Sequence, residues 1–157
     1  MKKIIALNAV DKISAAEKSK KKKIVLAGGC FDILHPGHIA FLNEAKKSGD
    51  LLFTFLESDL NIKKMKGKSR PINNQITRAG VLSSLPVVDY VIPLKGVTKN
   101  EEYDKLIVQI RPDFIAITEN DLGIEKRRKQ AEMVGAKLIV IKKINTPSSS
   151  ELIKNYG

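Results

Sequence analysis

Both histidines of the chain stand three residues apart, within the stretch GGCFDILHPGH at residues 28–38. Residues three apart on a helix share a face, so His35 and His38 can point at one ligand. Two imidazole N–H donors at a helix start suit the charge that develops on a polyphosphate as one of its bonds breaks. Gly28 and Gly29 have no Cβ, so the N–H groups of this turn can approach an anion closely. The stretch therefore predicts a phosphate-binding site.

The flanking sequence supplies the elements that position these residues. Residues 23–27 form a short aliphatic run that stops at Gly28, as a buried parallel strand does. From Ile39 onward apolar residues recur at helical spacing, and Pro36 suits a first helical turn because it has no N–H to leave unpaired. A helix is therefore predicted to begin near His35 or Pro36, where its free N–H groups and positive dipole end attract phosphate.

The rest of the chain alternates predicted strands and helices. Further strands are expected at residues 51–57, 89–94, 114–118 and 136–141, and helices at 73–84, 100–111 and 123–134. This order predicts a single α/β domain of the Rossmann-like, doubly wound class, with a mainly parallel five-stranded sheet. Ligands collect beyond the carboxyl ends of such strands, which is where residues 28–38 lie.

Three local expectations refine this outline. The lysine-rich residues 61–70 are predicted to form a loop beyond the second strand. Ser148 and Glu151 have capping-box spacing at the start of a last helix. The inward-facing residues of the helix at 73–84 are expected to be Ile76, Ala79, Gly80, Val81 and Leu82.

The charge of the chain is unevenly distributed. Residues 1–23 hold eight lysines against two acidic residues, and so carry more than half of the formal net charge of +11. Residues 1–22 are predicted to be a basic N-terminal leader with a short amphipathic helix at 11–19, ahead of a domain at 23–157. The lysine run at 18–23 is interpreted as a solvated linker or helix end. Nucleic-acid binding is the alternative, disfavoured because aromatic residues make up only 5% of the chain.

The composition also bounds the cellular setting. No apolar run approaches the ~20 residues that span a bilayer, and the first residues lack the long apolar region of a secretory signal. Cys30 is the single cysteine and has no partner for an internal disulfide, so a cytoplasmic protein is expected.

The whole stretch from Gly29 to His38 resembles the phosphate-binding signature of the cytidylyltransferase-like nucleotidyltransferase superfamily. The nearest branch is the adenylyltransferase domain that forms ADP-heptose, with glycerol-3-phosphate cytidylyltransferase and archaeal FAD synthetase as near relatives. Two further motifs match in order: Lys66-Gly67 followed by Arg70-Pro71 and Arg78, and the serines at 148–150, where the family has Ser-Thr-Thr or a close variant. The resemblance covers roughly residues 23–155.

This resemblance implies transfer of AMP or CMP from ATP or CTP to a phosphorylated sugar or polyol, with release of pyrophosphate. It implies catalytic roles for His35, His38 and Lys66. It implies nucleotide or phosphate binding by Gly28, Gly29, Cys30, Phe31, Asp32, Gly37, Arg78, Thr118, Ser148, Ser149 and Ser150. Mg²⁺ is expected as a counter-ion carried by the nucleotide rather than held in a protein metal site. Homodimers are common in the family.

One loop departs from the family pattern. The heptose branch has Lys-Gly-Gly-Asp after the fourth strand, whereas this chain has Thr-Glu-Asn-Asp at residues 118–121. The change leaves the nucleotide and the acceptor open, although the N-terminal segment and Gly-Cys-Phe-Asp favour ATP and a heptose 1-phosphate-like acceptor. It also motivates a rival hypothesis, a nucleotide-binding module without turnover.

Simpler interpretations of the two histidines remain. A structural zinc site would need a fourth ligand beyond His35, His38 and Cys30, and the chain has no further histidine or cysteine. The histidines can also be helix-cap residues without a ligand. Class I aminoacyl-tRNA synthetases carry a similar His-x-Gly-His, but 157 residues leave no room for their other domains.

Overall fold

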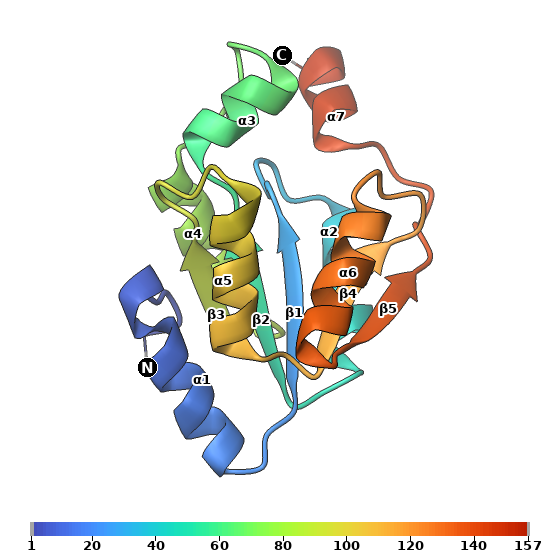
Figure 1. Ribbon diagram of the computed structural model, residues 1–157. Helices are drawn as coiled ribbons and strands as arrows, with labels where there is room; N and C mark the ends of the chain where they lie inside the picture. Colours follow the sequence, from blue (N-terminus) through green and yellow to red (C-terminus); the bar gives the residue numbers. More distant parts are fainter. Residues whose placement is uncertain (1, 157) are drawn as a thin grey trace.

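A computed structural model of the chain describes residues 2–156 and contains one five-stranded parallel sheet (Figure 1). Its strands are β1 (Ile24–Gly29), β2 (Leu51–Leu56), β3 (Tyr90–Pro93), β4 (Phe114–Thr118) and β5 (Lys137–Ile141). They lie in the order β3-β2-β1-β4-β5, and every neighbouring pair is parallel. The chain winds outward from β1 to β3 and then crosses to β4, which places the switch point beside β1. The predicted Rossmann-like class is confirmed.

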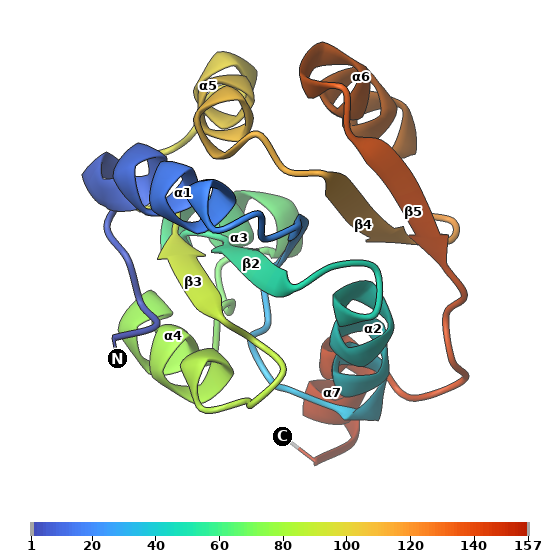
Figure 2. The ribbon, with the colours of Figure 1, turned by 90° about the horizontal axis from the view of Figure 1, so that it is seen from below.

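Helices cover both faces of this sheet (Figure 2). On one face lie α2 (Pro36–Lys46) and α4 (Gln75–Ser83); on the other lie α1 (Val10–Ser19), α5 (Asn100–Ile110) and α6 (Ile124–Val134). Alternate residues of β1 serve the two layers: Leu26 packs toward α5, and Ala27 packs toward α2. Both faces of the strand are buried, as its continuous aliphatic run predicts.

Two short helices stand at the carboxyl end of the sheet, α3 (Asp59–Lys66) and α7 (Ser149–Tyr156) (Figure 1). The prediction of a loop across residues 61–66 is therefore wrong. Ser58 caps α3 by accepting the Asn61 N–H at 3.2 Å, and lysines in the last turn complement the helix dipole. Gly67, with φ of 98°, ends the helix in a conformation that other residues rarely adopt.

The inward face of α4 also differs from the prediction. Ala79 and Leu82 are buried as expected, but Gly80 is exposed, and Ile76 and Val81 are 85% and 48% exposed. The third inward position is Arg78, whose side chain is fully buried. The apolar pattern pointed to the wrong face because this helix buries a guanidinium rather than a third aliphatic side chain.

The N-terminal residues pack on the same sheet. Ile5 donates its N–H to the Val91 carbonyl, and the Val91 N–H is donated to the Lys3 carbonyl, both at 2.9 Å. Leu7–Ala9 form a 3₁₀ turn, and α1 follows with Val10 completely buried in the cluster that contains α5. Within residues 2–156, no helix has the length and apolar character needed to cross a membrane.

Candidate functional site

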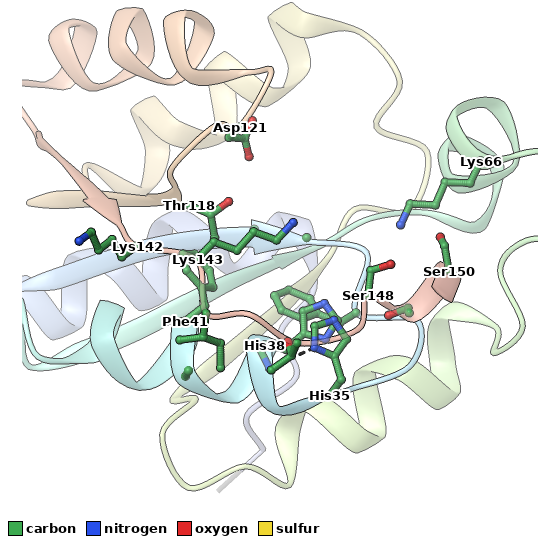
Figure 3. Close-up of a pocket in the computed structure, with 18 residues that line it drawn as sticks. His35, His38, Phe41, Lys66, Thr118, Asp121, Lys142, Lys143, Ser148 and Ser150 are labelled. Carbon is green, nitrogen blue, oxygen red and sulfur yellow. Dashed lines mark hydrogen bonds between the residues drawn. The ribbon is translucent and has the colours of Figure 1, made fainter. Parts of the chain in front are cut away.

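A cavity of about 270 Å³ opens at the carboxyl end of the sheet (Figure 3). Four parts of the chain far apart in sequence meet there: the turn from β1 into α2, the end of α3, the end of β4 with the loop after it, and the segment from β5 into α7. The structure gathers these predicted residues around it: Gly28, Gly29, Phe31, His35, Gly37, His38, Lys66, Thr118, Ser148, Ser149 and Ser150.

His35 occupies the N-cap of α2 and helps to build that helix end. Its Nδ1 accepts the Gly37 N–H at 3.1 Å, which leaves Nε2–H as the donor of the neutral ring. The His38 ring stacks on it, with ring centroids 3.8 Å apart and planes at 30°. A Cβ on Gly37 would lie 2.7 Å from the His35 Cε1 and 2.8 Å from the Thr146 Oγ1. The contact therefore requires glycine at position 37.

Both histidines are held neutral by their surroundings. Burial, with the nearby His35 and Lys66, lowers the pKa of His38 to about 4. Burial and Lys143 also lower the pKa of His35. The Nδ1 atom of His38 is buried and has no hydrogen-bond partner within residues 2–156. A pair of uncharged rings among lysines is a site in which an added anion would strongly stabilise the protonated, donating form.

Cations and hydroxyls at the cavity come from the end of α3 and from the segment between β5 and α7. Lys66 reaches toward the cavity from the last turn of α3, and Lys143 extends into it after β5 (Figure 3). The predicted capping box is confirmed, since the Ser148 N–H donates to Glu151 at 2.5 Å and the Glu151 N–H donates to Ser148 Oγ at 3.2 Å. The N-termini of α2 and α7 therefore converge on one cavity, and their dipoles add there.

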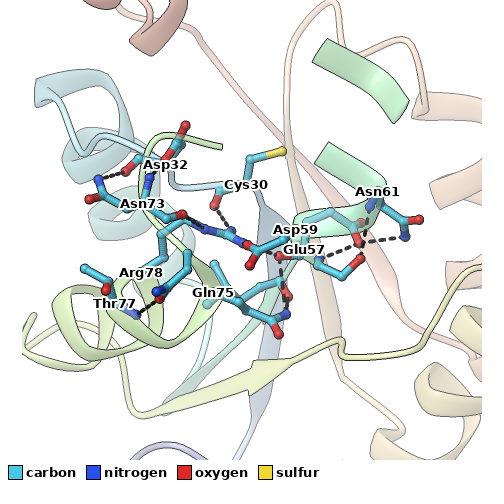
Figure 4. Close-up of polar contacts among 12 residues, drawn as sticks. Cys30, Asp32, Glu57, Asp59, Asn61, Asn73, Gln75, Thr77 and Arg78 are labelled. Carbon is cyan, nitrogen blue, oxygen red and sulfur yellow. Dashed lines mark hydrogen bonds and ion pairs between the residues drawn. The ribbon is translucent and has the colours of Figure 1, made fainter. Parts of the chain in front are cut away.

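Arg78 lies outside the cavity, in contrast to its predicted role as a phosphate ligand (Figure 4). Its guanidinium donates to the carbonyls of Cys30 at 2.6 Å, Glu57 at 2.9 Å and Asn73 at 3.0 Å, and to the carboxylate of Asp59 at 2.7 Å. These contacts join the turn after β1 to the turn after β2. Arg78 therefore shapes the wall of the site from behind.

Asp32 and Cys30 also do not line the cavity. The Asp32 carboxylate accepts the N–H groups of Ile72 and Asn73 at 2.9 Å each, and pairs with Arg70. Burial alone would raise the pKa of Asp32, but these hydrogen bonds outweigh it and hold the pKa below its usual value. Burial raises the pKa of the Cys30 thiol, which disfavours the reactive thiolate.

Sequence reasoning missed several residues that line the cavity, among them Asp121, Lys142, Lys143 and Thr146. The signal was present, because Asp121 and both lysines directly follow β4 and β5. Carboxyl ends of parallel strands meet at one edge of a sheet, and this rule applies to the fourth and fifth strands as much as to the first.

Comparison with known proteins now identifies the family. The chain matches the model of the cytidylyltransferase-like family over residues 26–155. It belongs to that family. The cytidylyltransferase-like match begins within β1 and ends within α7, so it includes all four segments that line the cavity, and it confirms the resemblance seen in the motifs.

Curated relatives of this cytidylyltransferase-like chain include proteins named bifunctional protein HldE. The one from Wolinella succinogenes is 44% identical over 112 residues, which cover 71% of this chain and 23% of the relative. The one from Campylobacter curvus is 38% identical over 138 residues, which cover 85% of this chain and 27% of the relative. The chain thus spans about a quarter of the length of these relatives.

Two solved structures share the fold. A lipopolysaccharide core biosynthesis protein from Thermoplasma volcanium GSS1 superposes with a TM-score of 0.64 at 28% identity, covering 80% of this chain and 98% of that one. Pantoate-beta-alanine ligase from Francisella tularensis superposes with a TM-score of 0.72 at 17% identity, covering 98% of this chain and 73% of that one. At that identity the ligase supports the fold alone.

Proposed function

We propose that this chain transfers a nucleotidyl group from ATP or CTP to a phosphorylated sugar or polyol and releases pyrophosphate. We favour ATP as donor and a heptose 1-phosphate-like acceptor, and a cytoplasmic location. The family match, the HldE relatives and the lipopolysaccharide core biosynthesis protein of related structure support this choice. The observation that carries it is the single cavity shared by His35, His38, Lys66 and the serines at 148–150.

In this proposal the triphosphate lies across the two converging helix N-termini. Lys66, Ser148 and Ser150 hold the β and γ phosphates, with the bare turn at Gly28 and Gly29 next to the α-phosphate. A phosphate oxygen of the acceptor attacks the α-phosphorus as the bond to the bridging oxygen of the β-phosphate breaks. That bonding pair leaves with pyrophosphate, so no covalent intermediate on the protein is needed.

The histidines respond to the charge that appears during this step. Their neutral rings donate N–H hydrogen bonds to the departing pyrophosphate, whose negative charge raises their pKa and favours protonation. Because the stacked pair is already oriented by α2, little reorganisation is required. Cys30 takes no part, since its thiol does not line the cavity.

The residues present fit a magnesium ion that arrives on the nucleotide. Within residues 2–156 no group of three or more histidine, cysteine or acidic side chains is placed to hold a metal, and the carboxylate lining the cavity is that of Asp121. Mg²⁺ is commonly bound by one carboxylate and the substrate phosphates. When bound, it would neutralise phosphate charge, and Asp121 is the side chain we expect near it.

In the altered loop after β4, one residue adopts a backbone conformation that glycine reaches without strain. Asn120 adopts a left-handed conformation with φ of 61°, and Asp121 accepts the Gly123 N–H at 2.6 Å. Thr118 and Asp121 both line the cavity. The pyrophosphate-release screen distinguishes turnover from the alternative of a nucleotide-binding module without catalysis.

A screen of pyrophosphate release tests the proposal. Four nucleoside triphosphates would be combined with heptose 1-phosphate, other sugar 1-phosphates, glycerol 3-phosphate and flavin mononucleotide. We expect release that requires both a triphosphate and one class of phosphorylated acceptor, with ATP and a sugar 1-phosphate best. Tight ATP or CTP binding by calorimetry without release from any acceptor would instead support the non-catalytic module.

A further inference from the structure

A buried ion pair behind the cavity links two of the segments that line it, the turn after β1 and the start of α7, through a residue that follows α3. The side chains of Arg70 and Asp32 are 6% and 1% exposed, and the Arg70 Nε donates to Asp32 Oδ2 at 2.8 Å. The Arg70 Nη1 donates to Ser150 Oγ at 2.9 Å. One planar guanidinium therefore joins the turn after β1 to the first turn of α7.

This link matters because α7 has few other attachments. Ser149 is its one buried residue within the described part of the chain, and Ser149 Oγ donates to the Ile33 carbonyl at 2.7 Å. The rest of the helix has no buried residue, and Figure 1 shows it beyond the carboxyl ends of the strands. Two side-chain hydrogen bonds, one at Ser149 and one at Ser150, thus hold the N-terminus of α7 over the cavity.

A requirement for folding alone does not explain why this residue is arginine. The Arg70 Nη2 atom is buried without a hydrogen-bond partner within residues 2–156, which costs free energy. A lysine would neutralise Asp32 without that unpaired donor. The guanidinium donates to Asp32 from Nε and to Ser150 from Nη1, in fixed directions that the flexible ammonium of a lysine does not hold.

We propose that Arg70 is a positioning residue that sets Ser150 and the N-terminus of α7 for the terminal phosphates of the nucleotide. This inference rests on the proposed function only in that the triphosphate lies in this cavity. Arg70 itself does not line the cavity and acts through Ser150. Replacing Arg70 therefore lowers the affinity for a ligand with β and γ phosphates, but not for one with an α-phosphate alone.

The test compares ATP and AMP binding by calorimetry, with thermal unfolding of each variant. The variants are Arg70→Lys, Ser150→Ala, the double substitution, and Arg128→Gln as a control that loses one exposed arginine far from the cavity. Arg70→Lys keeps the charge beside Asp32, so its melting temperature stays near wild type. Its ATP affinity falls about tenfold, as expected for the loss of one charge-assisted hydrogen bond, while AMP affinity changes less than about twofold.

The double variant identifies the route of the effect. Because Arg70 acts through Ser150, Arg70→Lys in the Ser150→Ala background costs no further ATP affinity, and Arg128→Gln binds as wild type does. Wild-type ATP affinity in Arg70→Lys, equal losses for ATP and AMP, or losses that multiply in the double variant would each overturn the proposal.

No turnover is needed for this measurement. If wild-type protein binds ATP but releases no pyrophosphate with any acceptor, the proposed function fails while the positioning role is still decided by the variants. If wild-type protein binds neither ATP nor CTP, both proposals fail.

Discussion

The surroundings of His38 favour its neutral form in the free protein, and a bound anion would favour its protonated form. Burial and neighbouring cations push its pKa to about 4, while His35 stacks against it at a helix end that attracts phosphate. The imidazole pair therefore forms a donor site for a polyanion without placing two extra charges in the free protein. This neutrality has a measurable effect on folding.

Stability is expected to fall as the pH drops from about 6.5 toward 4. In that window unfolded His38, with a pKa near 6.5, takes up a proton that folded His38, with a pKa of about 4, does not. The unfolding free energy therefore rises with pH through the window, and this contribution is flat above it. Denaturant titrations at several pH values measure the slope, and His38→Gln should flatten it. Equal slopes in both proteins would contradict a depressed pKa.

Arg78 is expected to matter for stability rather than for phosphate binding. Lysine cannot reproduce the contacts of the guanidinium to the carbonyls of Cys30 and Asn73 and to Asp59, so replacing Arg78 with lysine is expected to cost about 3 kcal/mol in unfolding free energy. Chemical denaturation measures this cost, and Arg128→Gln, on an exposed helix face, should change stability by less than about 0.5 kcal/mol. A variant of unchanged stability but weak ATP binding would restore Arg78 as a phosphate ligand.

At the scale of elements, the site depends on two helices whose N-termini face the same cavity. α2 and α7 are separated by more than a hundred residues in sequence, yet both bring their free N–H groups to one cavity. α2 is fixed by packing its own Phe41, Leu42 and Ala45 against the sheet, whereas α7 is fixed by side chains at its first turn. The position of each N-terminus is therefore a requirement for ligand binding.

Gly37→Ala tests the α2 end. Alanine suits a first helical turn, but its Cβ would lie within 3.0 Å of the His35 ring and Thr146, so one of them must move. We expect folding to be retained and ATP affinity to fall about tenfold as the ring pair is displaced. Gly80→Ala is the matched control, because a Cβ there meets nothing within 4 Å and should stabilise α4 by up to about 1 kcal/mol. Equal ATP affinity of both variants by calorimetry would contradict the requirement for glycine at position 37.

The sequence predicted the positions of the strands and helices better than it predicted which face of a helix is buried. Apolar runs located all five strands and most helices because burial on both faces leaves a continuous aliphatic signal, as in Ile24–Gly29. Helix α3 was missed because its lysines pointed to solvent, and its stability comes from caps and charge placement. The position of Arg78 outside the cavity was not predictable, because only tertiary structure brings three carbonyls from separate turns to one guanidinium. The cavity itself was predictable in outline, since the glycine turn, Lys66 and the serines all lie beyond strand ends.

Over the whole molecule, the basic N-terminal segment is part of the packing of the domain. Lys3 and Ile5 pair with β3, and Val10 is completely buried between α1 and the sheet. The lysines of this segment lie mostly on the outside, where their charges remain solvated. The segment therefore contributes apolar contacts to the core that α5 shares.

Val10→Ala is expected to lower the unfolding free energy of the entire chain. It removes two methyl groups from a fully buried position, at a cost of about 2 kcal/mol. Loss should appear as a shift of one cooperative transition measured by circular dichroism, with Val108→Ala, at a 47% exposed position, as the control. A separate, unpacked N-terminal segment would leave the transition unchanged.

In the proposed function, catalysis depends most on the stacked histidines. The direct measurement is the rate of acceptor-dependent pyrophosphate release by wild-type protein and by His38→Ala, each first shown to be folded. We predict that removing this donor lowers the rate by about 10²- to 10³-fold, as for other groups that stabilise transition-state charge. A folded His38→Ala protein that releases pyrophosphate at close to the wild-type rate would contradict the assignment.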